Sequence, residues 1–140
     1  MNTPFGRDAL KELSQACKRH GLNLGIYFSL IDWHYPPAYP ISSHNADPIT
    51  PEHHEYNKRQ VKELLENYGP VSELWFDMGS LTREQSRELY NLVKSIQPNC
   101  SVSGRIGNDY GDFAVMPDNV IPDYVPNKPW QTAESVYKET

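Results

Sequence analysis

The feature of the sequence that most restricts its fold is an alternation of helix-forming and short apolar segments. Apolar residues recur at helical spacing in three segments: 8–20, 51–68, and the stretch from the capping-box pattern at 82–85 to Pro98. Short apolar runs bounded by breakers, which predict buried strands, occupy three others: 22–31, 72–77 and 101–106. This order implies parallel strands joined by right-handed crossovers. It is typical of a doubly wound sheet or of part of a (β/α)8 barrel.

The motifs that doubly wound nucleotide-binding proteins often carry are absent from the sequence. Gly104-Arg105-Ile106-Gly107 lacks the GxGxxG spacing, and no GxxxxGK[ST] motif follows a predicted strand. We therefore predict the second α/β fold, a partial (β/α)8, TIM-like barrel. A complete barrel takes about 250 residues, whereas the chain has 140. We expect residues 1–140 to be a fragment of one catalytic barrel domain, with poor stability and little activity in isolation.

The charge balance and the hydropathy pattern argue against several classes of protein. Lys and Arg number 13 against 18 Asp and Glu, and the resulting net charge of −5 is unfavourable for a nucleic-acid binder. No apolar run approaches the roughly 18 residues of a membrane-spanning helix, and the first residues lack the apolar stretch of a signal peptide. Cys17 and Cys100 have neither zinc-site nor redox spacing, which favours free, buried thiols.

Polar side chains follow each predicted strand at its carboxyl end, where (β/α)8 barrels carry their catalytic residues. The first strand leads into Asp32-Trp33-His34, the second ends in Trp75-Phe76-Asp77, and the third ends near Arg105. A carboxylate beside aromatic rings suits sugar chemistry, because the rings cover apolar sugar faces and the carboxylate can attack or stabilise an anomeric centre. Asp77 is thus the leading catalytic candidate, and Arg105 could orient it. The alternatives are that Asp77 only caps the following turn and that Arg105 forms a surface ion pair.

Histidines and proline-rich stretches are further candidates for a site. His53 and His54 lie on a predicted helix, but the following residues do not complete the HExxH spacing, so a solvated helix face is favoured over metal binding. His34 directly follows a strand, which suits either a contact to a sugar hydroxyl or a hydrogen-bonded loop position. Most of the 12 prolines lie in 36–51 and 117–129, and these stretches predict long loops that form binding surfaces. After Gly107 the sequence is typical of loops, with a short strand or helix expected near 132–139.

In their order and spacing, several stretches resemble the α-L-fucosidases of glycoside hydrolase family 29. They are His20 to Ser29 leading to Asp32-Trp33-His34, Glu73 to Asp77, Asn91 to Pro98 with Arg105, Gly111-Asp112-Phe113, Asp118-Asn119, and Pro129-Trp130. The resemblance implies a (β/α)8-like catalytic domain that removes terminal α-L-fucose from glycans with net retention. It implies no cofactor and no metal.

The resemblance also implies roles for individual residues. Asp77 is expected to be the nucleophile that forms a covalent fucosyl-enzyme. Five residues are expected to bind the sugar: Tyr27, Trp33, His34, Trp75 and Arg105. Because fucose carries a methyl group in place of a hydroxymethyl group, an aromatic-walled pocket suits it.

The acid/base residue has three competing candidates: Asp118, Glu134 and Asp123. One branch of the family would place this carboxylate at Asp118, and another pattern has a Glu where this chain has Gln131. We prefer Asp118, with Glu134 as the alternative.

Two sections common in the family are not matched, namely N-terminal strands with a His-His pair and a C-terminal β-sandwich domain. Family habit suggests a secreted, periplasmic or lysosomal protein, but the chain itself predicts neither a compartment nor an oligomeric state. The rival interpretations are another retaining barrel glycosidase, a non-catalytic carbohydrate-binding remnant of one, and a structural α/β fragment without affinity for sugars.

Overall fold

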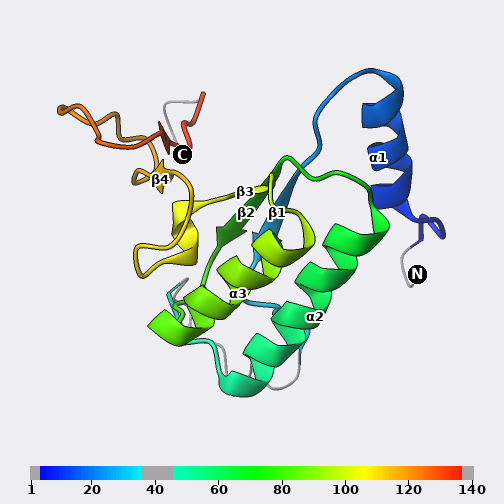
Figure 1. Ribbon diagram of the computed structural model, residues 1–140, viewed down its shortest axis with the longest axis horizontal. Helices are drawn as coiled ribbons and strands as arrows, with labels where there is room; N and C mark the ends of the chain where they lie inside the picture. The colour runs from blue at the N-terminus through cyan, green and yellow to red at the C-terminus, as the bar shows by residue number, and fades with distance from the viewer. Residues whose placement is uncertain (1–3, 36–45, 137–140) are drawn as a thin grey trace.

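The computed structural model describes residues 4–35 and 46–136 and has the predicted mixed α/β character, with parallel strands. Its main elements in chain order are α1 (Ala9–Arg19), β1 (Gly25–Ser29), α2 (Pro51–Asn67), β2 (Glu73–Asp77), α3 (Arg83–Ile96) and β3 (Ser101–Val102). A short 3-10 helix, η2 (Gly104–Ile106), and two short strands, β4 (Ala114–Val115) and β5 (Trp130–Gln131), follow. Figure 1 shows α2 and α3 side by side against the sheet, with α1 and the β4 region at its two flanks.

Each long helix begins at a side chain that satisfies its free backbone N–H groups. Asp8 accepts a hydrogen bond from the Lys11 N–H at 3.0 Å, at the start of α1. Thr50 caps α2 and is followed by Pro51 in the first turn. The predicted capping box at the start of α3 is confirmed, because the side chains of Thr82 and Gln85 each bond to the other residue's backbone N–H.

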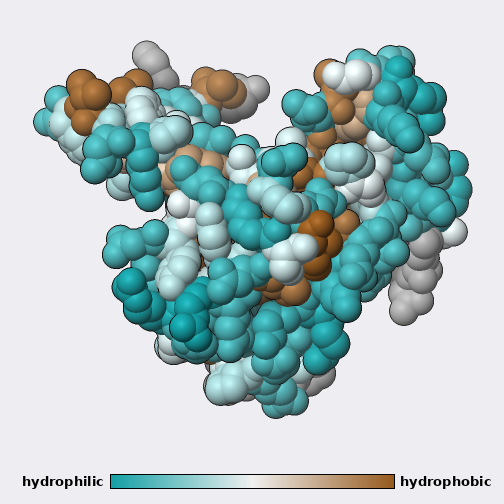
Figure 2. Space-filling model, in the orientation of Figure 1, coloured by the Kyte–Doolittle hydropathy of each residue, from teal (hydrophilic) through white to brown (hydrophobic). Residues whose placement is uncertain are grey.

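The main sheet has the order β1-β2-β3, and both of its pairings are parallel. Strand residues alternate between its two faces. One face carries the buried strand side chains, which are Ile26, Leu74, Phe76 and Val102. They pack with the buried side chains of α2 and α3, which are Val61, Leu65, Leu89 and Val93. The visible outer surfaces of α2 and α3 are mostly hydrophilic (Figure 2). The other face of the sheet carries Tyr27, Trp75 and Asp77, none of which is fully buried.

The third predicted strand, 101–106, is wrong in its second half. The strand ends at Val102, Ser103 keeps an extended backbone, and residues 104–106 form η2, in which the Ile106 N–H donates to the Ser103 carbonyl. The Ser103 hydroxyl donates to the Phe76 carbonyl at 3.1 Å, and the Ile106 carbonyl accepts from the buried Ser86 hydroxyl at 2.7 Å.

Two further boundaries differ from the predicted ones. The first strand is confined to Gly25–Ser29 within the predicted 22–31. A short strand or helix predicted near 132–139 is not found in its described part, 132–136, and residues 137–140 lie outside the described residues. The strand in this region is instead β5, which pairs in parallel with β4.

Two other sequence-based expectations concern the thiols and the hydropathy. Cys17 and Cys100 are both free; Cys100 is buried as predicted, whereas Cys17 is only half-buried. Within residues 4–35 and 46–136, no helix combines the length and the apolar character needed to span a bilayer. Part of the first proline-rich stretch, 36–45, lies outside the described residues.

Candidate active site

Asp77 lies at the carboxyl end of β2, as predicted. Leu74 and Phe76 are fully buried on the helix side of the strand, so Trp75 and Asp77 lie on the opposite face. The chain turns away directly afterwards through Met78 and Gly79, which both have positive φ. A Cβ atom at Gly79 would lie 2.7 Å from the Ile49 side chain, so the close turn requires glycine. The Asp77 side chain is 19% exposed and therefore remains accessible.

Two side chains bind the Asp77 carboxylate from neighbouring elements. Tyr27, paired in register with Trp75, donates its hydroxyl hydrogen to Asp77 Oδ2 at 2.8 Å. Arg105 of η2 donates from Nη1 to Asp77 Oδ1 at 3.1 Å. Partial burial, this hydrogen bond and the charge of Asp77 together raise the pKa of Tyr27 to about 12. Tyr27 is therefore a neutral hydrogen-bond donor at physiological pH.

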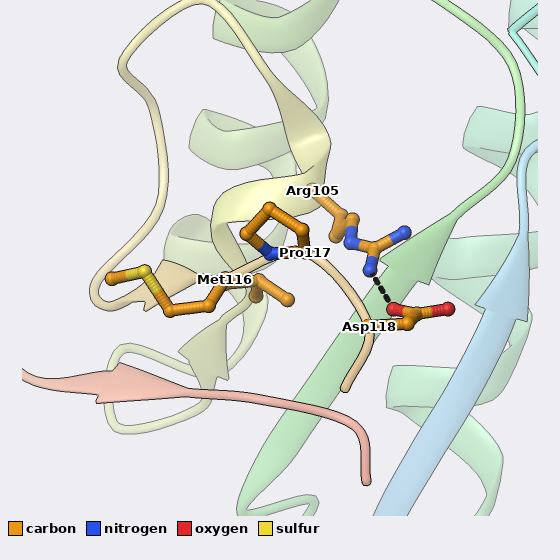
Figure 3. Close-up of a pocket in the computed structure, with 5 residues that line it drawn as sticks. Arg105, Met116, Pro117 and Asp118 are labelled. Atoms are coloured by element: carbon orange, nitrogen blue, oxygen red, sulfur yellow. Dashed lines mark hydrogen bonds and ion pairs between the residues drawn. The ribbon is translucent and has the colours of Figure 1, made fainter. Parts of the chain in front are cut away.

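Arg105 joins a second carboxylate to the cluster. Its Nη2 bonds to Asp118 Oδ1, so one guanidinium group holds Asp77 and Asp118 through two different nitrogens. Figure 3 shows the Arg105 and Asp118 side chains pointing toward each other and joined by this bond. Asp118 is 62% exposed, whereas Asp77 is 19% exposed. The two carboxylates thus share a cation but differ in their contact with solvent.

Trp75 supports this cluster with its indole ring. The Tyr27 ring is stacked with it at a centroid distance of 5.8 Å and an interplanar angle of 21°. The Arg105 guanidinium lies 5.4 Å from the ring centroid, a cation–π contact. The indole N–H donates to Gln131 Oε1 at 3.1 Å. Aromatic surface and carboxylates are therefore adjacent on the face of the sheet opposite the helices.

An open pocket of about 460 Å³ adjoins the cluster. It is lined by Arg105, Val115, Met116, Pro117 and Asp118. The charged ends of Arg105 and Asp118 form its polar side, and Val115, Met116 and Pro117 form its apolar side (Figure 3). A site of this kind can receive a ligand that has both hydroxyl groups and apolar surface.

The other predicted acid/base candidates lie apart from this cluster. Asp123 and Glu134 are exposed, and among the described residues neither bonds to Asp77 or Arg105. Of the three candidates, Asp118 is the one that the described structure joins to Arg105.

The two predicted sugar-binding residues that follow β1 lie in an exposed loop. Trp33 is 51% exposed, and the His34 backbone N–H donates to Asp32 Oδ1 at 2.8 Å. Within the described part of the chain, His34 is not among the residues that bond to Asp77. The roles predicted for both residues stay predictions.

The prediction of a solvated face for His53 and His54 is wrong, since they are only 2% and 3% exposed. His53 Nε2 accepts a hydrogen bond from the Asp32 N–H at 3.3 Å, and burial lowers the pKa of His53. His54 Nε2 lies 3.0 Å from Glu88 Oε2 of α3. The first turn of α2 is buried on two sides, by the loop after β1 and by α3, which the spacing of apolar residues does not reveal. Nowhere in the described ranges do three His, Cys, Asp or Glu side chains form a group that could hold a metal ion.

Sequence reasoning missed the part that Gln131 plays in the cluster. Its amide bonds to Trp75 and also to Glu73, with 3.2 Å between Gln131 Nε2 and Glu73 Oε2. These partners are more than 50 positions away along the chain. No local pattern marks such a residue, since its importance follows from the placement of β5 beside β2.

Comparison with known proteins identifies the family of this chain. The family model for alpha-L-fucosidase matches residues 1–139. The chain belongs to the alpha-L-fucosidase family. This finding confirms the resemblance to that family. A curated relative in this family is alpha-L-fucosidase 1 of Arabidopsis thaliana, which is 29% identical in an alignment 107 residues long that covers 73% of this chain and 19% of that protein.

Solved alpha-L-fucosidase structures share the fold. AlfC from Lactobacillus casei, in complex with α-L-fucose product, is 32% identical, with a TM-score of 0.72 over 89% of this chain and 44% of that one. Alpha-L-fucosidase isoenzyme 1 from Paenibacillus thiaminolyticus is 31% identical, with a TM-score of 0.74 over 92% of this chain and 38% of that one. The chain thus spans less than half the length of these relatives.

Proposed function

We propose that this chain carries the catalytic carboxylates of a retaining α-L-fucosidase, with Asp77 as the nucleophile and Asp118 as the acid/base residue. The observation that carries the proposal is the shared guanidinium of Arg105, which binds both carboxylates beside the ring of Trp75. A retaining glycosidase needs its two carboxyl groups about 5–5.5 Å apart. Binding to two nitrogens of one planar group holds the carboxylates close together.

In the first step, an Asp77 oxygen attacks the anomeric carbon of the fucosyl group and the bond from that carbon to the leaving oxygen breaks. Asp118 gives its proton to that oxygen, so the aglycone leaves as a neutral alcohol. The lower exposure of Asp77 suits a group that approaches the sugar ring, and the exposed Asp118 suits a group that faces the aglycone and water. Tyr27 and Arg105 orient the Asp77 carboxylate through its two oxygens.

In the second step, water replaces the aglycone. Asp118, now ionised, takes a proton from the water as its oxygen attacks the anomeric carbon, and the bond to Asp77 breaks. Asp77 leaves as a carboxylate, whose negative charge the Tyr27 hydroxyl and the Arg105 guanidinium stabilise. Two displacements at the same carbon give net retention. No electron transfer is involved, and the mechanism needs no cofactor.

We further propose that residues 1–140 form part of a (β/α)8 catalytic domain. The parallel order β1-β2-β3, with α2 and α3 on one face and the candidate site on the other, supports this architecture. In such a barrel the helices lie outside, and the catalytic side chains lie at the carboxyl ends of the strands. A fucosylated glycan is the proposed substrate, because AlfC, a relative, was solved with α-L-fucose product.

The roles of the two carboxylates can be separated with aryl α-L-fucosides of different leaving-group pKa. Asp77→Ala should lose turnover with every aglycone, and added azide should restore release as β-L-fucosyl azide. Asp118→Ala should be slowed by about 10²–10⁴ with poor leaving groups and far less with nitrophenol, which needs no proton.

Glu134→Ala and Asp123→Ala are matched controls and should keep normal turnover. Normal fucose release by Asp77→Ala would refute the assignment of the nucleophile. A leaving-group dependence that appears in Glu134→Ala instead of Asp118→Ala would move the acid/base role to Glu134. Binding of fucose without any hydrolysis by the unsubstituted chain, tested within a complete barrel, would indicate a non-catalytic carbohydrate-binding protein.

A further inference from the structure

The side chain of Gln131 connects the two sheets of the molecule. Gln131 belongs to β5, and its amide bonds with two residues of β2 on the face that carries the candidate site. Its Oε1 accepts from the Trp75 indole N–H at 3.1 Å, and its Nε2 donates to Glu73 Oε2 at 3.2 Å. The amide therefore contacts consecutive residues on that face, two positions and four positions before Asp77.

The two contacts require opposite hydrogen-bonding properties from one side chain. The Trp75 indole nitrogen only donates, and the ionised Glu73 carboxylate only accepts. A neutral amide supplies one acceptor and one donor, so Gln131 satisfies both. A glutamate in its place would put a second negative charge 3.2 Å from that of Glu73, and a leucine would satisfy neither partner.

The backbone around Gln131 in turn holds the segment that carries Asp118. The Met116 N–H donates to the Gln131 carbonyl at 2.8 Å, and the Thr132 hydroxyl donates to the Pro117 carbonyl at 3.1 Å. One residue beyond Asp118, the Asn119 N–H donates to the Ala133 carbonyl at 2.7 Å. The position of Asp118 is therefore fixed by residues 131–133.

We propose that Gln131 is a positioning residue, which ties β5 to Trp75 and Glu73 and so holds Asp118 at the proper distance from Asp77. This tie, meaning the hydrogen bonds of the Gln131 side chain to Trp75 and Glu73, acts on both β2 and β5. It fixes Trp75, over whose ring the Arg105 guanidinium lies, and it fixes the strand beside the Asp118 segment. The catalytic part of this inference rests on the proposed function, whereas the tie itself is a structural claim that can be tested without turnover.

The tie can be tested by exchanging the two side chains. Gln131→Glu alone should break it through repulsion by Glu73. The double variant Gln131→Glu with Glu73→Gln should restore it, because the exchanged carboxylate on β5 would accept from both the Trp75 indole and the new amide on β2. Glu73→Gln alone is the matched control and should be mild, since an amide oxygen can still accept from Gln131.

The first readout is the indole N–H signal of Trp75 in NMR spectra, assigned by its loss in Trp75→Phe. Its hydrogen exchange should be about fivefold faster in Gln131→Glu and Gln131→Leu, as expected for loss of a hydrogen bond of about 1 kcal/mol. In the double variant the exchange should return to the original rate. Equal exchange in the Gln131→Glu single variant and in the unsubstituted protein would overturn the tie.

The second readout is the dependence of fucoside turnover on leaving-group pKa. Gln131→Leu should slow poor leaving groups more than good ones, because proton donation by Asp118 is impaired, whereas a general loss of structure would slow all of them equally. Equal slowing would refute the positioning role. If the unsubstituted chain, tested within a complete barrel, releases no fucose at all, the proposed function fails with the catalytic part, and the exchange measurements still decide whether Gln131 holds Trp75 and Glu73.

Discussion

Gly104 offers a steric test of how the Arg105 segment is fixed. Gly104 begins η2, directly before Arg105, and its main chain lies against that of β4. A Cβ atom added there would lie 2.6 Å from the Phe113 carbonyl oxygen and 3.4 Å from the Ala114 Cα atom. Both atoms belong to the backbone and cannot rotate away. We predict that Gly104→Ala separates η2 from β4 and lowers the stability of the protein.

The magnitude follows from two opposing effects. Overpacking of a close contact costs about 1–3 kcal/mol, and more is expected here because the contact is with backbone. Restriction of the unfolded chain by the new methyl group returns about 0.4–1 kcal/mol. We therefore expect Gly104→Ala to lower the free energy of unfolding by about 2 kcal/mol. At an m-value of about 2 kcal/mol per molar urea, the unfolding midpoint should fall by about 1 M.

Gly25→Ala, at the start of β1, is the matched control. Its added Cβ atom would meet Glu73 Cβ at 3.8 Å, an ordinary van der Waals distance. Urea unfolding followed by circular dichroism should give a midpoint for Gly25→Ala that is unchanged or slightly raised. Equal midpoints for Gly104→Ala and Gly25→Ala would refute the close packing of η2 on β4 and, with it, this account of how Arg105 is held.

Three further predictions concern titratable groups. Partial burial and the hydrogen bond to the Asp77 carboxylate raise the pKa of Tyr27 to about 12. An ultraviolet titration of Tyr27→Phe should therefore lack one late phenol ionisation step that the unsubstituted protein shows. The stabilisation that the Tyr27 hydroxyl provides should be complete below about pH 10 and should be lost as the pH rises toward 12. Burial raises the pKa of Cys100 to about 11, so a thiol reagent at neutral pH should modify the half-buried Cys17 first, and modification of Cys100 before unfolding would contradict its placement. Burial disfavours ionisation of Asp112, but its hydrogen bonds, led by that from Lys94, outweigh burial and lower the pKa of the carboxyl group. We therefore expect Asp112→Asn to lower the free energy of unfolding by about 1 kcal/mol at neutral pH, a value already reduced for solvent exposure. That cost should shrink as the pH falls below about 4, where the unfolded chain takes up a proton, and disappear below the lowered pKa of the folded protein, where the ion pair is lost. Urea unfolding at several pH values would reveal a constant cost if the reasoning is wrong.

The elements with strong local signals were predictable from the sequence. Thr50 with Pro51 and the capping box at Thr82 mark the starts of two helices, because capping depends on residues within one turn of each other. The end of the third strand was not predictable in the same way. Ser103 precedes η2 and Ile106 ends it, and they bond to Phe76 and Ser86, which lie on other elements and far away along the chain.

In the candidate site, too, some features follow from local sequence and others only from contacts between distant residues. That Asp77 ends a buried strand beside Trp75, and that Arg105 follows the next strand, could be predicted from the amino-acid order, because alternation within a strand and parallel crossovers are local rules. The sequence alone could not predict which distant carboxylate binds Arg105. Three-dimensional packing joined Asp118 to the cluster, left Glu134 exposed, and set Gln131 against Trp75. These contacts depend on how β5 packs beside β4 and β2, and that packing is the sum of many long-range contacts that no short stretch of sequence contains.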